Sequence, residues 1–325
     1  MVFTKDTKIR EITQHPSFRG FGHLLFPLQL AFHPEETVQD VTDSNHFIWY
    51  SNLKTKTSLE VLNNLLERAQ KNEQIFFPIY DEDEMVKDPS KRETGLFYFK
   101  GKEYEKFALI NAGGGFHYVA ALHDSFPQAL ALSQRGYNAF ALIYRPEKAY
   151  EDLAQALDYL YSHSSELKID PDQYSLWGGS AGARMAIRLG NKSELQRLTR
   201  TSIGPASMVV SQYTGYSSVS RDDAPTYANC GTNDWIANWQ VMENRLKNLK
   251  KLGIDSQFHV YKGLGHGFGI GKDTVAEGWI DNAISFWEKQ INKQKLEKNN
   301  EISNYWCSRT NSGISYPTGI RRNRF

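Results

Sequence analysis

The sequence has few of the features that mark a secreted, membrane-bound or nucleic-acid-binding protein. Its 325 residues include two cysteines, Cys230 and Cys307, which cannot form a disulfide framework and fit a reducing compartment. No uninterrupted apolar run approaches the roughly 20 residues of a membrane-spanning helix. The 38 basic and 37 acidic residues leave a formal net charge of +1, which gives no basis for a nucleic-acid surface. We therefore expect a cytoplasmic protein without nucleic-acid or membrane partners.

Residues 21–32 are the one stretch that resembles a signal peptide. Basic residues precede this apolar patch, but Gly22, His23 and Pro27 interrupt it, and no small-residue cleavage site follows. We therefore expect this stretch to belong to the folded protein.

The middle of the chain alternates between short apolar runs and helix-competent segments. Strands are predicted at residues 107–111, 139–144, 174–177, 207–212, 226–230 and 257–261, and helices at 121–135, 149–162, after 180, 239–252 and 275–290. Such alternation favours an α/β fold with a mostly parallel central sheet and helices on both faces. Loops that carry a binding site lie beyond the carboxyl ends of the strands in such sheets.

Two flanking segments differ from this region. Residues 1–94 are rich in aromatic residues and include a predicted amphipathic helix at 57–71, so we expect them to pack on the main domain. Residues 291–325 are polar and then basic, and we expect a disordered tail. The predicted organisation is an N-terminal segment at 1–94, a core at 95–290 and a tail at 291–325.

The start of the core is predicted to be antiparallel. Strands at residues 75–80 and 95–100 lie on either side of a charged loop at 81–92. The pair Gly101 and Lys102 is typical of a hairpin turn into the next strand. This arrangement predicts an antiparallel N-terminal edge to the sheet.

The segment around Ser180 contains the pattern Gly-x-Ser-x-Gly. An apolar run precedes it and a helix-competent run follows, which is the strand–turn–helix context of a nucleophile elbow. Gly178 and Gly182 stand where side chains would collide in so sharp a turn. The alternative is a glycine-rich turn without chemistry, because the pattern alone is not specific.

A serine nucleophile needs a base and a third group that orients the base. His266 follows the last predicted strand within a glycine-rich loop, and Asp234 follows the strand before it. Other aspartates between Ser180 and His266 precede their strands and would lie at the wrong edge of the sheet: Asp222, Asp223 and Asp255. The alternatives are an incidental loop histidine and an aspartate that forms a turn or helix cap. The order Ser180, Asp234, His266 predicts a catalytic triad.

Three successive glycines follow the first central strand, at residues 113–115. Their backbone N–H groups can point inward without side chains in the way, so we predict an oxyanion hole formed by Gly114, Gly115 and the N–H of Ala181. A phosphate-binding loop is the alternative. The pattern Gly-x-Gly-x-x-Gly is absent, however, and no Gly-Lys-Ser/Thr follows.

Taken together, these motifs resemble the α/β-hydrolase superfamily over residues 95–290. The resemblance is to its acetyl-esterase and carboxylesterase branch, which is related to the hormone-sensitive-lipase group. A histidine usually precedes the glycine triplet in that group, whereas this chain has Ala112. The resemblance implies the α/β-hydrolase fold and a serine esterase that forms an acyl-enzyme on Ser180 without a metal or other cofactor. Related enzymes that act on acetylated sugars or short acyl esters vary at the position of Ala112. The resemblance therefore favours a small-molecule substrate with a short acyl or acetyl ester.

Aromatic residues near these motifs are candidates for a small substrate pocket: Phe116, His117, Trp177 and Trp235. Packing in the core is the alternative for each of them. Peptidases, amidases, lactonases and acyltransferases use the same triad, so these activities are the alternatives to an esterase. A non-catalytic binding protein is a further alternative. It is disfavoured because nucleophile, base, acid and glycine loop are all present.

Overall fold

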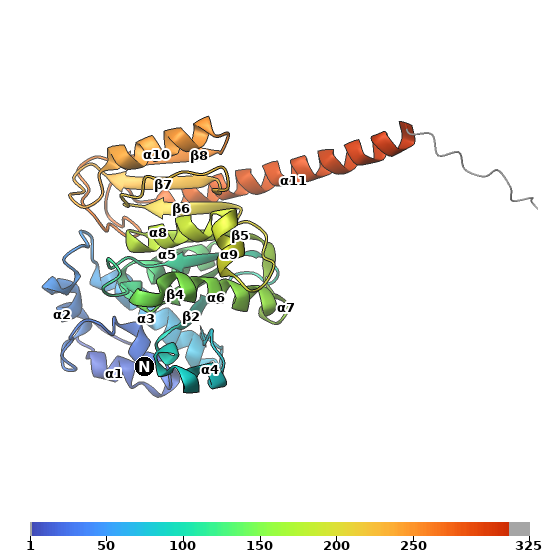
Figure 1. Cartoon of the computed structure of the whole chain (residues 1–325). Helices are drawn as coiled ribbons and strands as arrows, with labels where there is room; N and C mark the ends of the chain where they lie inside the picture. The colour runs from blue at the N-terminus through green and yellow to red at the C-terminus, as the bar shows by residue number, and fades with distance from the viewer. Residues whose placement is uncertain (1, 312–325) are drawn as a thin grey trace, which may run out of the picture.

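The computed structural model describes the backbone of residues 2–311 and the side chains of residues 2–300. One eight-stranded sheet crosses the molecule in the order β1-β2-β4-β3-β5-β6-β7-β8 (Figure 1). The strands are β1 (Phe76–Phe77), β2 (Gly95–Phe99), β3 (Lys106–Asn111), β4 (Asn138–Ile143), β5 (Asp170–Gly179), β6 (Met208–Gln212), β7 (Thr226–Gly231) and β8 (Ser256–Tyr261). β2 is antiparallel to β1 and β4, and the other pairs are parallel. The predicted fold class is confirmed.

Helices cover both faces of this sheet. The α-helices are α1 (Ile9–Thr13), α2 (Val38–Asp43), α3 (Thr55–Gln70), α4 (Glu82–Lys87), α5 (Ser125–Gln134), α6 (Ala149–Ser162), α7 (Ser164–Leu167), α8 (Ala181–Leu189), α9 (Lys192–Leu198), α10 (Trp239–Lys251) and α11 (Trp279–Asn311). Successive residues of β5 demonstrate the two faces. Trp177 packs against Trp279 of α11, whereas a side chain at Gly178 would collide with α8. Strands β3 and β4 are buried along their whole length, as the apolar runs in their middle require.

The predicted hairpin at Gly101 and Lys102 is wrong. The neighbours of β2 are β1 and β4, and β3 lies on the far side of β4. The backbone N–H of Lys102 donates instead to the carbonyl of Gly136, in the turn before β4. The chain passes from β3 through α5 to β4, a crossover that joins parallel strands, and β3 pairs with β4 and β5.

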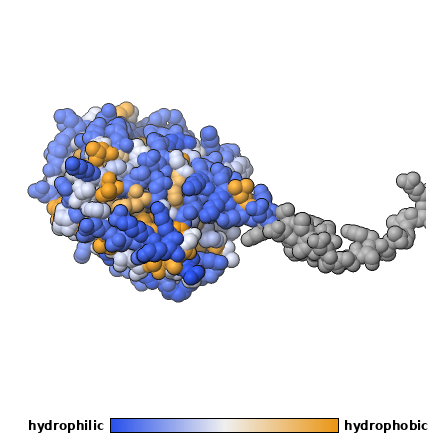
Figure 2. Space-filling model, turned by 90° about the horizontal axis from the view of Figure 1, so that it is seen from above, coloured by the Kyte–Doolittle hydropathy of each residue, from blue (hydrophilic) through white to orange (hydrophobic). Residues whose placement is uncertain are grey.

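The last helix is longer than predicted. α11 begins at Trp279 and continues to Asn311, so residues 291–311 of the predicted disordered tail are helical, while residues 312–325 lie outside the described residues. Lys, Gln and Glu are good helix formers, so this polar sequence can continue the helix that begins on the sheet domain. α11 extends away from the sheet (Figure 1), and residues 292–300 are exposed. Within the described part of the chain, no helix is both long and apolar enough to cross a membrane. On the face drawn in Figure 2, hydrophilic residues predominate and apolar ones are scattered among them.

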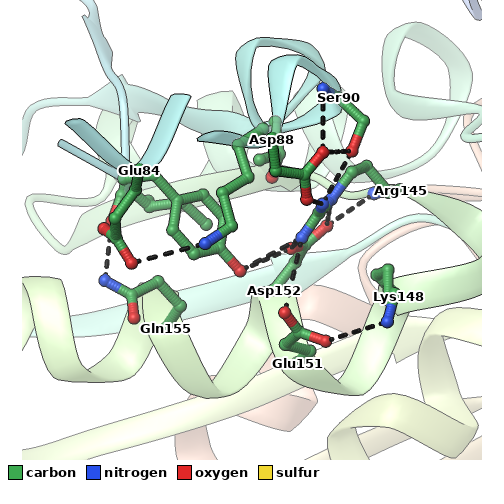
Figure 3. Close-up of polar contacts among 12 residues, drawn as sticks. Glu84, Asp88, Ser90, Arg145, Lys148, Glu151, Asp152 and Gln155 are labelled. Atoms are coloured by element: carbon green, nitrogen blue, oxygen red, sulfur yellow. Dashed lines mark hydrogen bonds and ion pairs between the residues drawn. The ribbon is translucent and has the colours of Figure 1, made fainter. Parts of the chain in front are cut away.

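The N-terminal segment packs on the sheet domain through apolar and charged contacts. The buried face of α3 joins the main core through Val61, Leu62, Leu65 and Leu66. A buried ion pair joins Arg145, after β4, to Asp152 of α6, with 2.6 Å between Nη2 and Oδ1. Figure 3 shows Arg145 also pointing toward Asp88, whose Oδ2 is 3.1 Å from Nη1. The core arginine therefore holds the stretch before β2 in place.

Candidate active site

Ser180 occupies a strained turn between β5 and α8. Its φ of 52° and ψ of −113° place a non-glycine residue in the positive-φ region, which costs conformational energy. A Cβ at Gly178 would collide with the backbone of Gly182, and a Cβ at Gly182 would collide with the backbone of Asn111. The two glycines therefore permit the close approach of β3, β5 and α8. This turn exposes the Ser180 side chain at the carboxyl edge of the sheet.

Three loops bring Ser180, His266 and Asp234 together at this edge. His266 Nε2 lies 2.9 Å from Ser180 Oγ, and His266 Nδ1 lies 2.8 Å from Asp234 Oδ2. The His266 and Asp234 side chains are buried. The predicted serine, histidine and aspartate thus form one continuous chain of hydrogen bonds.

The carboxylate of Asp234 is itself held in a fixed orientation. Its Oδ1 accepts the backbone N–H groups of Ile236, at 2.9 Å, and Ala237, at 2.7 Å. The other oxygen, Oδ2, is left to face His266 and lies 3.6 Å from the Cys230 sulfur. Burial raises the pKa of the Cys230 thiol, which therefore stays protonated at neutral pH and is not a nucleophile.

The glycine loop lies beside Ser180 and carries unpaired backbone donors. Gly114 and Gly115 have φ values of +130° and +63°. Within the described residues, the N–H groups of Gly114, Gly115 and Ala181 have no protein acceptor. Gly115 and Ala181 line the same pocket as Ser180, whereas Gly114 is buried and is not part of this lining. Ala181 also begins α8, so the positive end of the helix dipole faces this point.

Asp124 lies beneath the glycine loop, and the sequence analysis did not identify it. Its fully buried Oδ2 accepts the backbone N–H of Gly113 at 2.8 Å and the hydroxyl of Tyr50 at 2.9 Å. Oδ1 accepts from Gln128 Nε2 at 2.8 Å and from the hydroxyl of Tyr213 at 3.2 Å. Burial raises the pKa of Asp124, and the hydrogen bonds from Gly113, Tyr50 and Tyr213 oppose that shift. An aspartate directly before a helix is usually an N-cap, so the sequence does not distinguish Asp124 from an ordinary capping residue. In the structure its side chain does not cap α5.

A pocket of about 210 Å³ opens next to Ser180. Residues that follow β3, β5, β6 and β7 line it: Gly115, Phe116, Ser180, Ala181, Arg184, Tyr213, Thr214, Gly215, Ile236 and Ala237. Arg184 is the only charged side chain in this lining. Sequence reasoning missed it, although it lies one helical turn after Ser180, where a side chain of α8 returns to the same face.

Of the four aromatic residues predicted for the pocket, Phe116 lines it and three do not. Trp177 is fully buried in β5, and its Nε1 donates to Ser175 Oγ at 2.7 Å, so the alternative of core packing holds. Trp235 is 74% exposed on the surface. His117 is also exposed and faces Trp49, with 6.0 Å between the ring centroids. Side chains alternate between the two faces of a strand, and Trp177 lies on the face of β5 that packs against α11. It therefore does not reach the pocket.

Side chains that could hold a metal ion are not gathered at this site. Across the part of the chain that the structure describes, no group of three or more His, Cys, Asp or Glu residues is placed to bind one.

Solved structures that are similar in fold to this chain include hydrolases and an esterase. An α/β-hydrolase enzyme from a Medee basin deep-sea metagenome library, MGS-M1, is 21% identical, with a TM-score of 0.51 over 61% of this chain and 93% of that chain. The chain has the α/β-hydrolase fold. An acetyl ester-xyloside bifunctional hydrolase from Caldicellulosiruptor lactoaceticus is 20% identical, with a TM-score of 0.57 over 66% of this chain and 95% of that chain. The predicted resemblance to the α/β-hydrolase superfamily is confirmed in the fold.

A third similar structure is that of an esterase with bound propionate. The esterase Est2 from Thermogutta terrifontis, with propionate bound, is 20% identical, with a TM-score of 0.53 over 60% of this chain and 89% of that chain. The family model described as BD-FAE matches residues 100–236, which include the glycine loop, Ser180 and Asp234. None of the curated proteins matches the sequence. The matched range begins at residue 100 and so excludes the N-terminal segment, which contains the Tyr50 that donates to Asp124.

Proposed function

We propose that this α/β hydrolase is a serine esterase that hydrolyses short-chain carboxylic esters through an acyl-enzyme. One observation carries the proposal: Ser180, His266 and Asp234 form a hydrogen-bonded chain beside a pocket. A hydroxyl, an imidazole and a carboxylate in this order are the groups that make serine nucleophilic at neutral pH.

The reaction begins when Ser180 Oγ attacks the carbonyl carbon of the ester. The hydroxyl proton passes to His266 Nε2, and Asp234 stabilises the resulting imidazolium through the Nδ1–H bond. The carbonyl oxygen becomes an oxyanion that accepts the N–H groups of the glycine loop and of Ala181. Each such donor lowers the barrier by about 3 kcal/mol.

Collapse of this intermediate breaks the bond to the alcohol, which leaves with the proton from His266. The acyl group remains on Ser180. A water molecule then gives a proton to His266 and attacks the acyl carbon, which releases the carboxylic acid and restores the serine hydroxyl.

The size of the pocket supports a short acyl group. About 210 Å³ is below the 300–1,000 Å³ typical of sites for drug-sized ligands. The T. terrifontis esterase, which has the same fold, holds propionate. We therefore propose acyl chains of two to four carbons and acetyl esters as the preferred substrates.

Turnover of p-nitrophenyl esters from acetate to dodecanoate tests this proposal. We expect the highest kcat/KM at two to four carbons and no turnover by Ser180→Ala. Ser193→Ala removes an exposed serine hydroxyl on α9 and is expected to retain full activity. Best turnover of long-chain esters would contradict the proposed acyl specificity, and an active Ser180→Ala variant would contradict the mechanism.

The same assay separates the esterase from its alternatives. A p-nitroanilide with the preferred acyl group measures amidase activity, and an added alcohol as acyl acceptor measures transfer. Faster cleavage of the anilide than of the ester, or transfer that exceeds hydrolysis in water, would replace the esterase assignment by an amidase or an acyltransferase.

A further inference from the structure

We propose that Tyr50 is a positioning residue, which fixes the glycine loop through Asp124 and so aligns the oxyanion donors with Ser180. This inference rests on the proposed function. It assigns a role in the reaction to a segment that lies outside the family-model match at residues 100–236.

Residues 49–52 pass between the two loops that the reaction needs. On one side, the backbone N–H of Ser51 donates to the carbonyls of His266, at 3.0 Å, and Gly267, at 3.3 Å. Asn52 Nδ2 also donates to the carbonyl of Lys272 at 3.1 Å. The segment is therefore bonded directly to the backbone of the proposed catalytic base.

On its other side, the segment contacts the glycine loop. The indole of Trp49 stacks on the ring of Tyr118, with 5.4 Å between centroids and 7° between planes. The backbone N–H of Tyr118 in turn donates to the carbonyl of Gly114 at 3.2 Å. The indole of Trp49 also packs against the loop itself, because a Cβ at Gly115 would lie 3.0 Å from its Cζ3. The stacked pair thus supports the loop by packing, and Tyr50 supplies the polar link.

The polar link is one carboxylate oxygen shared by two donors. Asp124 Oδ2 accepts the hydroxyl of Tyr50 at 2.9 Å and the backbone N–H of Gly113 at 2.8 Å. Gly113 directly precedes Gly114 and Gly115, whose N–H groups we propose as oxyanion donors. The orientation of this carboxylate therefore sets the orientation of the loop.

Packing at this point leaves little freedom for the loop to move. A Cβ at Gly113 would lie 2.8 Å from the Tyr50 hydroxyl and 3.0 Å from the Ser180 Cβ. A Cβ at Gly267 would lie 2.6 Å from the carbonyl oxygen of Trp49. At these glycine positions the backbone of each loop packs directly against the segment. A small shift of either loop toward the segment would therefore cause a steric clash.

Loss of the Tyr50 hydroxyl would weaken this arrangement without removing a group that touches the substrate. Asp124 is fully buried, so water cannot replace the missing donor without opening the site. Oδ2 would then be held by Gly113 alone, and the carboxylate could turn toward its partners on Oδ1. The oxyanion donors would lose alignment, which affects the transition state more than the bound substrate.

The variant Tyr50→Phe tests this role. We expect kcat to fall about tenfold with KM within twofold of wild type, because only transition-state binding is lost. Butylboronic acid adds to the serine hydroxyl as a tetrahedral boronate without a leaving group, and so mimics the intermediate. Its Kd is expected to rise by a factor similar to the loss in kcat.

Tyr174→Phe is the matched control. The Tyr174 hydroxyl donates to the carbonyl of Gly204 at 2.9 Å, so this variant also loses one tyrosine hydrogen bond, at a distance from the site. We expect a change in Tm like that of Tyr50→Phe, with wild-type kcat and boronic acid affinity.

Three results would overturn the inference. Wild-type kcat and boronic acid affinity in Tyr50→Phe would leave Tyr50 with a structural role only. A rise in KM at constant kcat would make it a substrate contact. A wild-type protein that neither hydrolyses esters nor binds the boronic acid would overturn the proposed function, and this role with it.

Discussion

Asp234→Asn is expected to abolish most of the activity even though it changes the shape of the side chain very little. Oδ1 of Asp234 accepts two backbone N–H groups, from Ile236 and Ala237. An asparagine must therefore keep its carbonyl oxygen at that position. Its NH₂ group then occupies the position of Oδ2, 2.8 Å from His266 Nδ1.

An amide N–H at this position imposes the wrong tautomer on His266. Nδ1 must accept a hydrogen bond and so carries no proton, which places the proton on Nε2. Nε2 then cannot accept the proton of Ser180, from which it is separated by 2.9 Å. A triad with intact geometry and the wrong tautomer loses about 10⁴-fold in kcat, which corresponds to about 5 kcal/mol in the barrier.

Steady-state hydrolysis of p-nitrophenyl acetate measures this loss, and thermal unfolding reports whether the variant is folded. Asp255→Asn is the control, because Asp255 lies before β8 and pairs with Lys293 at 3.1 Å. We expect it to retain wild-type kcat. A folded Asp234→Asn variant within tenfold of wild type would refute the reasoning about the tautomer.

Two further predictions concern pH and charge. Burial lowers the pKa of His123 from 6.5 to about 3. Between pH 6.5 and pH 3, His123 therefore binds a proton in the unfolded chain and stays neutral in the native state. The free energy of unfolding falls by about 1.4 kcal/mol per pH unit over this range. Denaturant unfolding of His123→Gln should show a shallower fall, and an unchanged slope would contradict the assignment. Arg184 is the only charged residue that lines the pocket. Monomethyl succinate carries a carboxylate that Arg184 can attract, whereas methyl butyrate is uncharged. Arg184→Gln should therefore lower the ratio of kcat/KM for monomethyl succinate to kcat/KM for methyl butyrate about two- to fivefold. Arg188 pairs with Glu194 at 2.9 Å, so Arg188→Gln should leave this ratio unchanged, and an unchanged ratio in Arg184→Gln would contradict the prediction.

Much of the fold follows from local sequence signals. The helix predicted at residues 149–162 coincides with α6, and the strand predicted at 226–230 is β7 without its last residue. The position of Ser180 between a strand and a helix also follows from the sequence, because glycines are required where backbones approach so closely. The chain order of serine, aspartate and histidine then locates residues that folding brings to one edge of the sheet.

The remaining features depend on contacts that the sequence does not encode locally. The neighbour of β2 is β4, which enters the sheet between β2 and β3 after the crossover through α5, and the turn at Gly101 carries no signal of this. Trp177 differs from a pocket residue only in the face of β5 to which it points. Asp124 and Tyr50 are separated by 74 residues and meet only in the folded protein.

Covalent labelling of Ser180 tests the central claim most directly. Paraoxon transfers a diethylphosphoryl group to an activated serine and releases p-nitrophenolate, and intact-mass and peptide mass spectrometry locate the product. We predict one diethylphosphoryl group per chain, on Ser180, with loss of esterase activity in proportion to labelling and no labelling of Ser180→Ala. Labelling at another residue, or full activity after Ser180 is labelled, would contradict the account.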